Sequence, residues 1–417
     1  MARIVMKFGG TSVANIERIQ NVALHVKREV EAGHEVAVVV SAMAGVTNQL
    51  VAWCKEAMPN YATSEYDAVV SSGEQVTSGL LAIALNNLGI KARSYQGWQI
   101  PLRTDSTHGS ARIQGIEGDA LSKDLSSGTV ACIAGFQGVS PEGRIATLGR
   151  GGSDTSAVAI AAGIKADRCD IYTDVDGVYT TDPRIVPKAR RLPRVAFEEM
   201  LEMASLGAKV LQVRSVELAM VHNVRVFVRS SFDAPDAPQI GPGGLPPGTL
   251  ICDEEEIVEQ QVVTGIAYSK DEAQITLRGV QDKPGVAAAV FGPLAEAHIN
   301  VDMIVQNISD DGTTTDLTFT VPVADYERAM ATLRAGNGAI GYAKIDGASD
   351  VVKVSVVGIG MRSHAGVAAK AFAALAANGI NIRVIATSEI KISVLIDTAH
   401  TELAVRTLHS IYGLDQA

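Results

Sequence analysis

The sequence of 417 residues predicts an α/β fold, in which a mostly parallel sheet lies between two layers of helices and two smaller βαββαβ units follow. Three observations carry this prediction. Residues 1–231 alternate apolar runs with helix-period segments, a stretch rich in proline and glycine comes next, and the C-terminal part contains an internal repeat. Strands that are apolar on both faces are typical of a parallel sheet covered by helices on both sides.

Five strands rich in valine and isoleucine are predicted in the N-terminal part. They are Arg3–Phe8, Glu35–Ser41, Thr129–Gly135, Cys169–Asp174 and Val224–Ser230. Segments with helical periodicity lie between them, at Ile16–Glu31, Val76–Leu88 and Ala157–Ala162. This order predicts a three-layer α/β/α domain over residues 1–231.

Residues 232–261 are predicted to be a linker between domains. Five prolines and four glycines fall within the nineteen residues from Phe232 to Leu250, which is too many for a regular element.

An internal repeat follows the linker. Gly285–Asn300 and Gly366–Asn381 align at a constant offset of 81 with nine identities in sixteen positions. The first copy, predicted as a domain over residues 273–346, reads as a complete βαββαβ unit. Its elements are Gln274–Gly279, Val286–His298, Val301–Gln306, Asp316–Val321, Tyr326–Arg334 and Tyr342–Ile345.

The second copy lacks its fourth strand. Its elements are Val352–Val357, Val367–Asn378, Ile382–Ala386, Lys391–Ile396 and Glu402–Tyr412. An unassigned strand, Val262–Ser269, precedes the first copy, and we predict that it completes the second. The second domain would then consist of residues 262–272 and 347–417, with the first domain inserted in it.

Composition excludes several classes of protein. Hydrophobic residues make up 47% and charged residues 20% of the chain, as in soluble globular proteins. The net charge of −10 argues against a nucleic-acid partner. No apolar run reaches the ~18 residues of a membrane span, and the first residues do not read as a secretory signal. The four cysteines show no pairing pattern, which predicts a cytoplasmic protein.

A first glycine-rich loop, Lys7–Val13, leaves a predicted strand and enters a helix. Glycines let backbone N–H groups approach a ligand, and a helix N-terminus together with Lys7 favours anions, so the loop can cradle phosphate. A simple β–α turn with a solvated lysine is the alternative. The loop does not match the P-loop pattern.

A second loop, Gly149–Thr155, leads into an alanine-rich helix. Ser153 or Asp154 could serve only as the helix N-cap. Capping requires neither Arg150 nor two consecutive glycines, however, and arginine beside exposed amides is suited to binding a carboxylate.

A third turn, Thr173–Tyr179, is followed by Asp182-Pro183-Arg184 and later by Gly207-Ala208-Lys209. A hairpin with an Asp-Gly turn is its local alternative. Since loops at the carboxyl ends of parallel strands form the usual binding crevice of open α/β sheets, the three loops together favour a site.

These motifs, with Ser71-Ser72-Gly73-Glu74-Gln75, resemble the motif set of the aspartate kinases within the amino-acid kinase superfamily. The resemblance covers essentially the whole chain, because the repeat looks like the paired, ferredoxin-like ACT domains of that family. It implies transfer of the γ-phosphoryl of ATP to L-aspartate, giving ADP and 4-phospho-L-aspartate, the first step towards lysine, threonine and methionine.

The resemblance also implies roles for individual residues. Lys7 and Asp154 would be catalytic, with Asp154 orienting Lys7. Glu74 would bind the α-ammonium group of aspartate and Arg150 its α-carboxylate. The full implied ATP-binding set is Lys7, Gly9, Gly10, Thr173, Asp174, Tyr179, Arg184 and Lys209, and the aspartate-binding set is Ser41, Thr47, Glu74, Arg150, Gly151, Gly152, Ser153 and Asp154.

Each assignment has a plainer structural alternative. Glu74 could be a surface residue at a helix start, Lys209 a solvated cation at a helix end, and Thr173 and Tyr179 could only pack the strand. The expected reaction nevertheless fits these residues. A carboxylate nucleophile is already ionised at pH 7, so the reaction needs positive charge rather than a base, and Lys7, Arg184 and Lys209 can supply it. No cluster of His or Cys ligands is visible, so Mg²⁺ is expected to arrive on ATP.

An effector site is predicted in the loop Asp282–Ala287 of the first repeat. Backbone N–H groups at the helix start can bind a carboxylate, and Asp282 an ammonium group. Capping by Asp282 is the alternative, and the second repeat has Ser363 in its place. The expected site comprises Asp282, Gly285, Val286, Ala287, Asn300, Val301, Asp302 and Gln306, with Val367, Ala368, Asn381, Ile382, Ser388 and Glu389 from the second repeat.

By resemblance the effector is lysine, threonine or both, and the protein is an oligomer formed through its ACT domains. Some relatives pair the full chain with a shorter one from an internal start, but no methionine lies between Met220 and Met303. Two other functions are alternatives. One is a related kinase acting on acetylglutamate, glutamate or UMP, and the other is a non-catalytic amino-acid sensor that retains the kinase fold.

Overall fold

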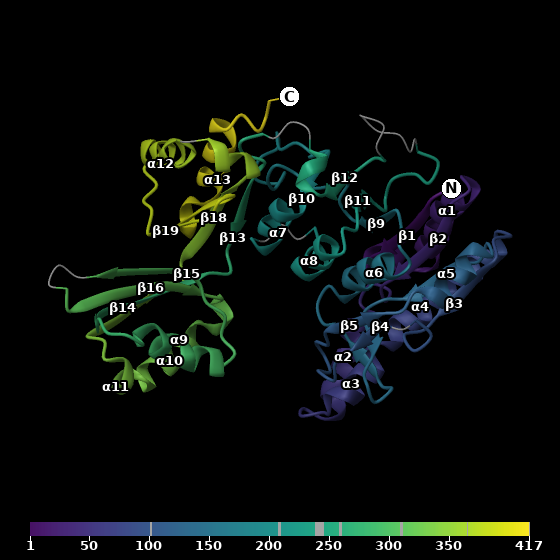
Figure 1. Ribbon diagram of the computed structural model, residues 1–417, viewed down its shortest axis with the longest axis horizontal. Helices are drawn as coiled ribbons and strands as arrows, with labels where there is room; N and C mark the ends of the chain where they lie inside the picture. Colours follow the sequence, from purple (N-terminus) through teal and green to yellow (C-terminus); the bar gives the residue numbers. More distant parts are fainter. Residues whose placement is uncertain are drawn as a thin grey trace. The chain divides into compact units, whose positions relative to one another are not determined.

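The computed structural model describes residues 1–100, 102–206, 210–237, 246–257, 261–308, 312–364 and 366–416 (Figure 1). The chain forms two compact units. The first consists of Met1–Val178, Arg191–Ser205 and Lys209–Val258, and the second of Tyr179–Arg190, Leu206–Ala208 and Glu259–Ala417.

An eight-stranded sheet forms the centre of the first unit, in the order β10-β12-β11-β9-β1-β2-β6-β3. Neighbouring strands run parallel except β11 and β12, which are antiparallel. The strands are β1 (Arg3–Phe8), β2 (Glu35–Val40), β3 (Ala92–Tyr95), β6 (Val130–Ala134), β9 (Arg168–Thr173), β10 (Arg194–Ala196), β11 (Val226–Ser230) and β12 (Thr249–Cys252).

Helices cover both faces of this sheet. Side chains alternate along a strand, so Ile4, Met6 and Phe8 of β1 pack on one face against α1 (Ile16–Glu31) and α4 (Ser72–Asn87). Helix α6 (Gly152–Gly163) packs on the other face against β1, β2 and β9. The remaining helices of the unit are α2 (Val46–Ala57), α3 (Thr63–Val70), α5 (Asp119–Ser126), α7 (Phe197–Ser205) and α8 (Val213–Val221). The predicted three-layer α/β/α fold is confirmed.

A second, four-stranded sheet of the first unit was not predicted. Its order is β5-β4-β7-β8. Its strands have only three or four residues, which is too short for periodicity to reveal them. They are β4 (Leu102–Thr104), β5 (Ile113–Ile116), β7 (Gln137–Val139) and β8 (Ile145–Thr147).

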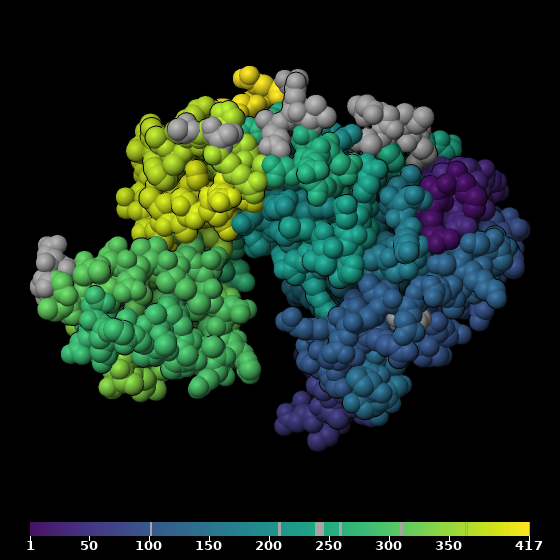
Figure 2. Space-filling model, viewed as in Figure 1, coloured from purple at the N-terminus to yellow at the C-terminus, as the bar shows by residue number. Residues whose placement is uncertain are grey.

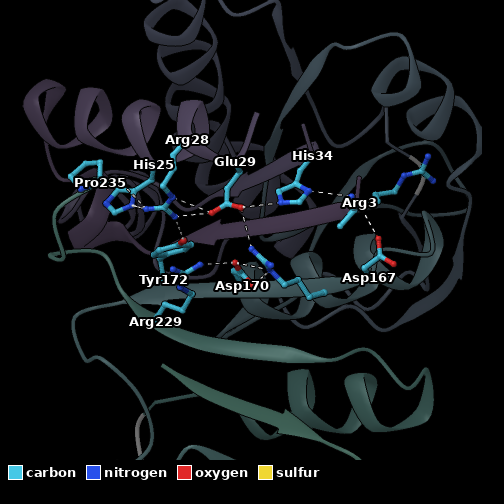
Figure 3. A network of polar contacts seen from close by, with 12 residues as sticks. Arg3, His25, Arg28, Glu29, His34, Asp167, Asp170, Tyr172, Arg229 and Pro235 are labelled. Carbon is cyan, nitrogen blue, oxygen red and sulfur yellow. Dashed lines mark hydrogen bonds and ion pairs between the residues drawn. The ribbon is translucent and has the colours of Figure 1, made fainter. Parts of the chain in front are cut away.

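A buried polar network joins α1 to β9 and β11 (Figure 3). The Glu29 carboxylate accepts hydrogen bonds from Arg28 at 2.8 Å and from Arg168 at 3.2 Å. Arg168 and Arg229 both bind Asp170, which is fully buried. Because every one of these charges has a partner of opposite sign, they can lie within the protein and hold α1 against the sheet.

The second unit contains two sheets of four strands each. The first has the order β15-β16-β14-β17, with α9 and α10 packed on its core (Figure 1). Its elements are β14 (Ala273–Gln281), α9 (Val286–Glu296), β15 (Asp302–Ile308), β16 (Thr314–Val321), α10 (Tyr326–Ala335), α11 (Asn337–Ile340) and β17 (Lys344–Ala348).

The other sheet has the order β13-β18-β20-β19. Strand β13 (Gly265–Ser269) pairs antiparallel with β18 (Val351–Val357), in the place that β17 takes beside β14. The pairing expected for the strand before the first repeat is therefore present. The other elements are α12 (Val367–Ala377), β19 (Val384–Thr387), β20 (Lys391–Asp397) and α13 (Thr401–Ile411).

The two sheets of the second unit meet along β15 and β19, and Figure 2 shows their green and yellow surfaces in contact. Met303, Val351, Val384 and Leu395 form a small apolar cluster there. Beside it, Lys353 Nζ lies 2.5 Å from Glu272 and 2.7 Å from Asp302.

One segment of the chain folds away from its sequence neighbours. Tyr179–Arg190, which we call the strap, follows the N-terminal unit in sequence but belongs to the second unit. Thr180 O accepts a hydrogen bond from Ile266 N at 2.8 Å, and Ile185 and Val186 are buried in the core around α12 and α13. The strap is thus part of the fold that contains β13.

The predicted linker contains regular structure. Strand β12, within residues 232–261, pairs with β11 and β10 in the large sheet. All four residues of β12, Thr-Leu-Ile-Cys, are buried. This burial stabilises a strand although the proline-rich sequence before it had predicted no regular element. Residues 238–245 and 258–260 of the predicted linker lie outside the described residues.

Among the described residues, one helical stretch, Thr63–Asn87, is long and apolar enough to cross a membrane, and half of its apolar window is buried inside the protein. A core helix passes the same test, so this is weak evidence for a span. The four cysteines are all buried and unpaired.

Candidate active site

Lys7 and Asp154 form an ion pair at the carboxyl end of β1. Because Ile4, Met6 and Phe8 face α1, Lys7 projects from the opposite face towards the first turn of α6. Its Nζ lies 2.6 Å from Asp154 Oδ1, and the two side chains are only 10% and 12% exposed. The structure therefore joins the two residues expected to be catalytic.

A cavity of about 490 Å³ opens beside this ion pair. Loops that follow β1, β2 and β8 form its walls with the start of α4, as expected for the carboxyl edge of a parallel sheet. Its lining residues are Lys7, Gly10, Ser41, Ala42, Met43, Ala44, Gly45, Thr47, Tyr66, Glu74, Gly109, Phe136, Gly149, Arg150, Gly151, Gly152, Ser153 and Asp154. The eight residues expected to bind aspartate are all among them.

The turn before α6 depends on glycine. Gly149 and Gly151 have φ angles of +77° and +72°, where side chains are disfavoured. A Cβ atom on Gly151 would also overlap the side chain of Gln212. This turn places the N-terminus of the twelve-residue α6 against the cavity, which favours a bound anion.

Glu74, at the start of α4, supplies a buried carboxylate. Its Oε1 accepts a hydrogen bond from Ala42 N at 3.1 Å, whereas Oε2 has no hydrogen-bond partner among the described residues. Burial raises the pKa of Glu74 to about 7, and the bond from Ala42 N opposes that shift. A cationic ligand group at Oε2 would complete its interactions.

Some residues expected to bind ATP lie outside the cavity lining. Gly9 follows β1, and its N–H donates to Tyr172 O at 3.4 Å. Thr173 and Asp174 stand at the end of β9, the neighbour of β1 in the sheet, and Thr173 Oγ1 donates to Asp174 Oδ1. Tyr179 and Arg184 belong to the strap of the second unit.

Arg184 is held by a neighbour in the strap. Its guanidinium is 87% exposed and donates to Asp182, whose other contact is the Tyr268 hydroxyl. Lys209 lies outside the described residues.

The residues expected to bind an effector are drawn from two separate cores. Val286 is buried in the core of the first repeat, and Val367 in that of the second. Gly285 and Gly366 have φ angles of +94° and +93° at the starts of α9 and α12, so the two loops share one conformation. Asp302 is bound to Lys353, and Glu389 lies 3.4 Å from Arg362.

The lining also contains Ala42, Met43, Ala44 and Gly45, which lie between the predicted Ser41 and Thr47, and three residues outside every predicted motif, Tyr66, Gly109 and Phe136. Tyr66, Gly109 and Phe136 belong to α3 and to the loops of the small sheet, neither of which was predicted. Phe136 has a φ of +69°, rare for a residue other than glycine, but this conformation leaves no mark in the sequence.

Family models match the chain over both units. Residues 2–230 match the amino acid kinase family, and residues 275–335 and 354–412 each match an ACT domain. The chain is 54% identical to an aspartokinase of Pseudomonas aeruginosa, with 100% of this chain and 98% of that protein covered.

Solved structures agree. Aspartokinase III of Escherichia coli, in complex with aspartate and ADP, superposes with a TM-score of 0.77 at 28% identity, covering 98% of this chain and 99% of that chain. The same enzyme in complex with lysine and aspartate gives 0.74 at 27% identity, with 98% of both chains covered. The chain therefore belongs to the aspartate kinase family, joins an amino acid kinase domain to two ACT domains, and is a phosphotransferase.

Proposed function

We propose that the enzyme transfers the γ-phosphoryl group of ATP to the side-chain carboxylate of L-aspartate. The observation that carries this proposal is the cavity, because it combines an arginine and a buried lysine with Glu74, whose Oε2 has no hydrogen-bond partner in the part of the chain that the structure describes. An amino acid with an acidic side chain presents one ammonium group and two carboxylates. Glu74 would bind the ammonium and Arg150 the α-carboxylate, leaving the second carboxylate near Lys7.

The reaction needs positive charge rather than a base. The acceptor carboxylate has an ordinary pKa near 4 and is ionised at pH 7. Its approach to a polyanionic triphosphate is opposed by repulsion, which Lys7 and the backbone N–H groups of the glycine-rich loops would reduce. Asp154 would hold Lys7 in place through the 2.6 Å ion pair. Ser41, Thr47 and Ser153 would complete the pocket.

The nucleotide would lie at the carboxyl ends of β1 and β9, where Gly9, Gly10, Thr173 and Asp174 stand. The described residues contain no group of three or more His, Cys, Asp or Glu side chains that could hold a metal ion. Phosphate oxygens would therefore supply most ligands of a Mg²⁺ ion carried on ATP, which would neutralise phosphate charge. Tyr179, Arg184 and Lys209 remain candidates for the nucleotide.

A coupled assay for ADP release would test the acceptor. Aspartate, glutamate, acetylglutamate and UMP are compared at equal concentrations, and we expect turnover with aspartate to be fastest. Faster turnover with any other acceptor would overturn the proposal. Lys7→Ala should lower kcat by at least about a hundredfold while the protein remains folded.

We also propose that lysine, threonine or both inhibit the enzyme through the first ACT domain. Asp282 is exposed beside the eleven-residue helix α9, so it could bind an ammonium group while the helix start binds a carboxylate. The E. coli relative bound to lysine supports the effector class. Asp282→Ala should weaken inhibition without changing uninhibited turnover, and an unaltered titration with both amino acids would place the site elsewhere.

Two further proposals concern the oligomeric state of the protein and its location in the cell. Exposed Ile304, Ile308 and Ile385 on edge strands β15 and β19 support an oligomer formed through the ACT domains. Light scattering should then give the mass of an oligomer, and the Ile304→Asp substitution should lower that mass.

A cytoplasmic location agrees with four free cysteines, because oxidising compartments favour disulfides.

A further inference from the structure

Asp67 is a fully buried carboxylate outside the cavity lining, on helix α3. It accepts hydrogen bonds from two distant segments. Thr147 contributes its N–H at 3.0 Å and its hydroxyl at 2.5 Å, and Gly109 N lies 3.1 Å from both carboxylate oxygens. His108 Nδ1 lies 2.7 Å from Oδ2. A single side chain therefore ties α3 to strand β8 and to the loop before β5.

Each of these segments ends at the cavity wall. Tyr66 precedes Asp67, Gly109 is itself a lining residue, and Thr147 stands three residues before Arg150. Arg150 is exposed, so packing of its own side chain does little to fix its direction. Its position depends on the turn that carries it, and Asp67 holds the strand from which that turn leaves.

We propose that Asp67 is a positioning residue for acceptor binding. By holding Gly109 and Thr147, Asp67 fixes the cavity wall that carries Arg150, so that Arg150 can bind the α-carboxylate of the substrate. This inference rests on the proposed function. It assigns Asp67 to acceptor binding and not to the nucleotide, because no segment bound by Asp67 belongs to β1, β9 or their following loops. The carboxylate suits this place because only N–H and O–H groups point at it.

The first test is Asp67→Asn in the full-length enzyme. The amide would direct an N–H group at the donors of Thr147 and Gly109, and would remove the charge that strengthens their bonds. We expect KM for aspartate to rise at least tenfold, while KM for ATP stays within about twofold and kcat changes little. The matched control is Glu29→Gln, another buried carboxylate, which accepts from Arg28 and Arg168 in the network on α1 shown in Figure 3. It should lower thermal stability without raising KM for aspartate.

Substitution of Thr147 gives a second test, in which the Asp67 carboxylate itself is unchanged. Thr147→Val removes the hydroxyl donor and should raise KM for aspartate by a smaller factor, whereas Thr147→Ser retains it and should restore the wild-type value. This pair decides the matter if Asp67→Asn does not yield folded protein. Equal increases in both KM values, or a loss of stability alone, would overturn the positioning role. If the wild-type enzyme does not phosphorylate aspartate, the proposed function itself is wrong, and this result is distinct from a failure of the positioning role.

Discussion

Two buried oxygens of Glu74 have different surroundings, and the difference bears on both stability and binding. One accepts the bond from Ala42 N, while the other has no hydrogen-bond partner among the residues described. Since burial raises the pKa to about 7, we expect both neutral and ionised Glu74 near neutral pH in the free enzyme. An ammonium group of a substrate would favour the ionised form.

Activity should therefore depend on pH through Glu74. As pH falls below about 7, the free enzyme gains a proton that opposes binding of an ammonium group, so kcat/KM for aspartate should decrease. Glu74→Gln should raise KM for aspartate at every pH and flatten this dependence. A profile of kcat/KM between pH 5.5 and 8.5 for both proteins is the measurement, and identical slopes would contradict the assignment.

The same residue should weaken the fold at high pH. Between the ordinary value of 4.5 and about 7, the folded protein keeps a proton that the unfolded chain has released, so the free energy of unfolding falls as pH rises through this window. Above pH 7 the loss is on the order of 3 kcal/mol. Glu74→Gln should thus melt at a higher temperature than wild type at pH 8, but not at pH 4.5.

Arg150 offers a simpler prediction. Arg150→Ala would remove a charge-assisted pair with the α-carboxylate, worth roughly 1.5–3 kcal/mol, and should raise KM for aspartate about tenfold to a hundredfold. KM for ATP should change little. Arg144→Ala is a suitable control, because Arg144 lies just before β8 in a surface ion pair with Glu65. Equal weakening of both substrates by Arg150→Ala would refute its role.

Strand β15 shows how an element can be fixed by one side chain from a neighbouring sheet. Met303 has a φ of +47° within an irregular part of the β15–β16 pairing, and its N–H donates to Asp302. Lys353 of β18 holds that same carboxylate and Glu272, and its side chain is only 8% exposed. The junction of the two ACT sheets is therefore partly ionic.

Lys353→Met should destabilise the second unit by roughly 3–5 kcal/mol, because it leaves the buried Glu272 carboxylate without its cation. Chemical denaturation should show this loss, and adding Glu272→Gln should restore a large part of it. Lys344→Met is the matched control. Lys344 is 67% exposed in its pair with Asp346, and such surface pairs contribute only about 0–1 kcal/mol. Equal effects of the two substitutions would contradict the argument.

At the scale of the whole molecule, the strap is the segment that continues the chain from the first unit into the second. It begins directly after the Thr173–Val178 loop and is held within the second unit by four hydrogen bonds of side chains. Arg406 donates to Ile185 O, Arg190 to Leu414 O and Tyr268 to Asp182, while Thr180 Oγ1 lies 2.9 Å from His409 Nε2. We propose that a change in the ACT domains reaches the Thr173–Val178 loop along this segment, because the chain is continuous there.

We expect His409 to make the stability of the strap depend on pH. Burial lowers its pKa below 6.5, Arg190 adds to the shift and Asp415 opposes it. Below pH 6.5 the unfolded chain binds a proton that the folded protein resists, so the stability contributed by neutral His409 is lost as pH falls. Protonation also alters the Thr180–His409 hydrogen bond, because Nε2 of a charged imidazole can only donate. Hydrogen-exchange protection factors of residues 179–190 should be smaller at pH 5.5 than at pH 7.5.

His409→Gln should make this protection independent of pH across the same range. The exposed His222 of the other unit serves as the control, since His222→Gln should leave the pH dependence of the strap unchanged. A strap whose protection does not respond to pH in the wild-type protein would contradict the role of His409.

Local patterns were sufficient for the five adjacent strands β11, β9, β1, β2 and β6 of the large sheet and for the repeat, but not for β3, β10 and β12. Strand β1 and helix α1 have the predicted bounds, because their apolar periodicity is strong and their burial follows it. The glycine-rich loops were recognisable for the same reason: a positive φ at Gly151 or Gly285 is a requirement on one residue, which the sequence records directly. These signals pointed to the loops that carry Lys7 and Arg150, whereas Glu74 was added to the same predicted site only by the resemblance to the aspartate kinases.

Long-range contacts decided the rest. Asp67 receives its partners from residues 41 to 80 positions away, strand β12 is stabilised by β10 and β11, and the strap packs on α13 more than 200 residues later. None of these has a local signature, because short strands and single buried carboxylates are selected by what surrounds them after folding. The residues expected to bind ligands were therefore readable in the sequence, while the side chains that hold them in position became visible only in the folded protein.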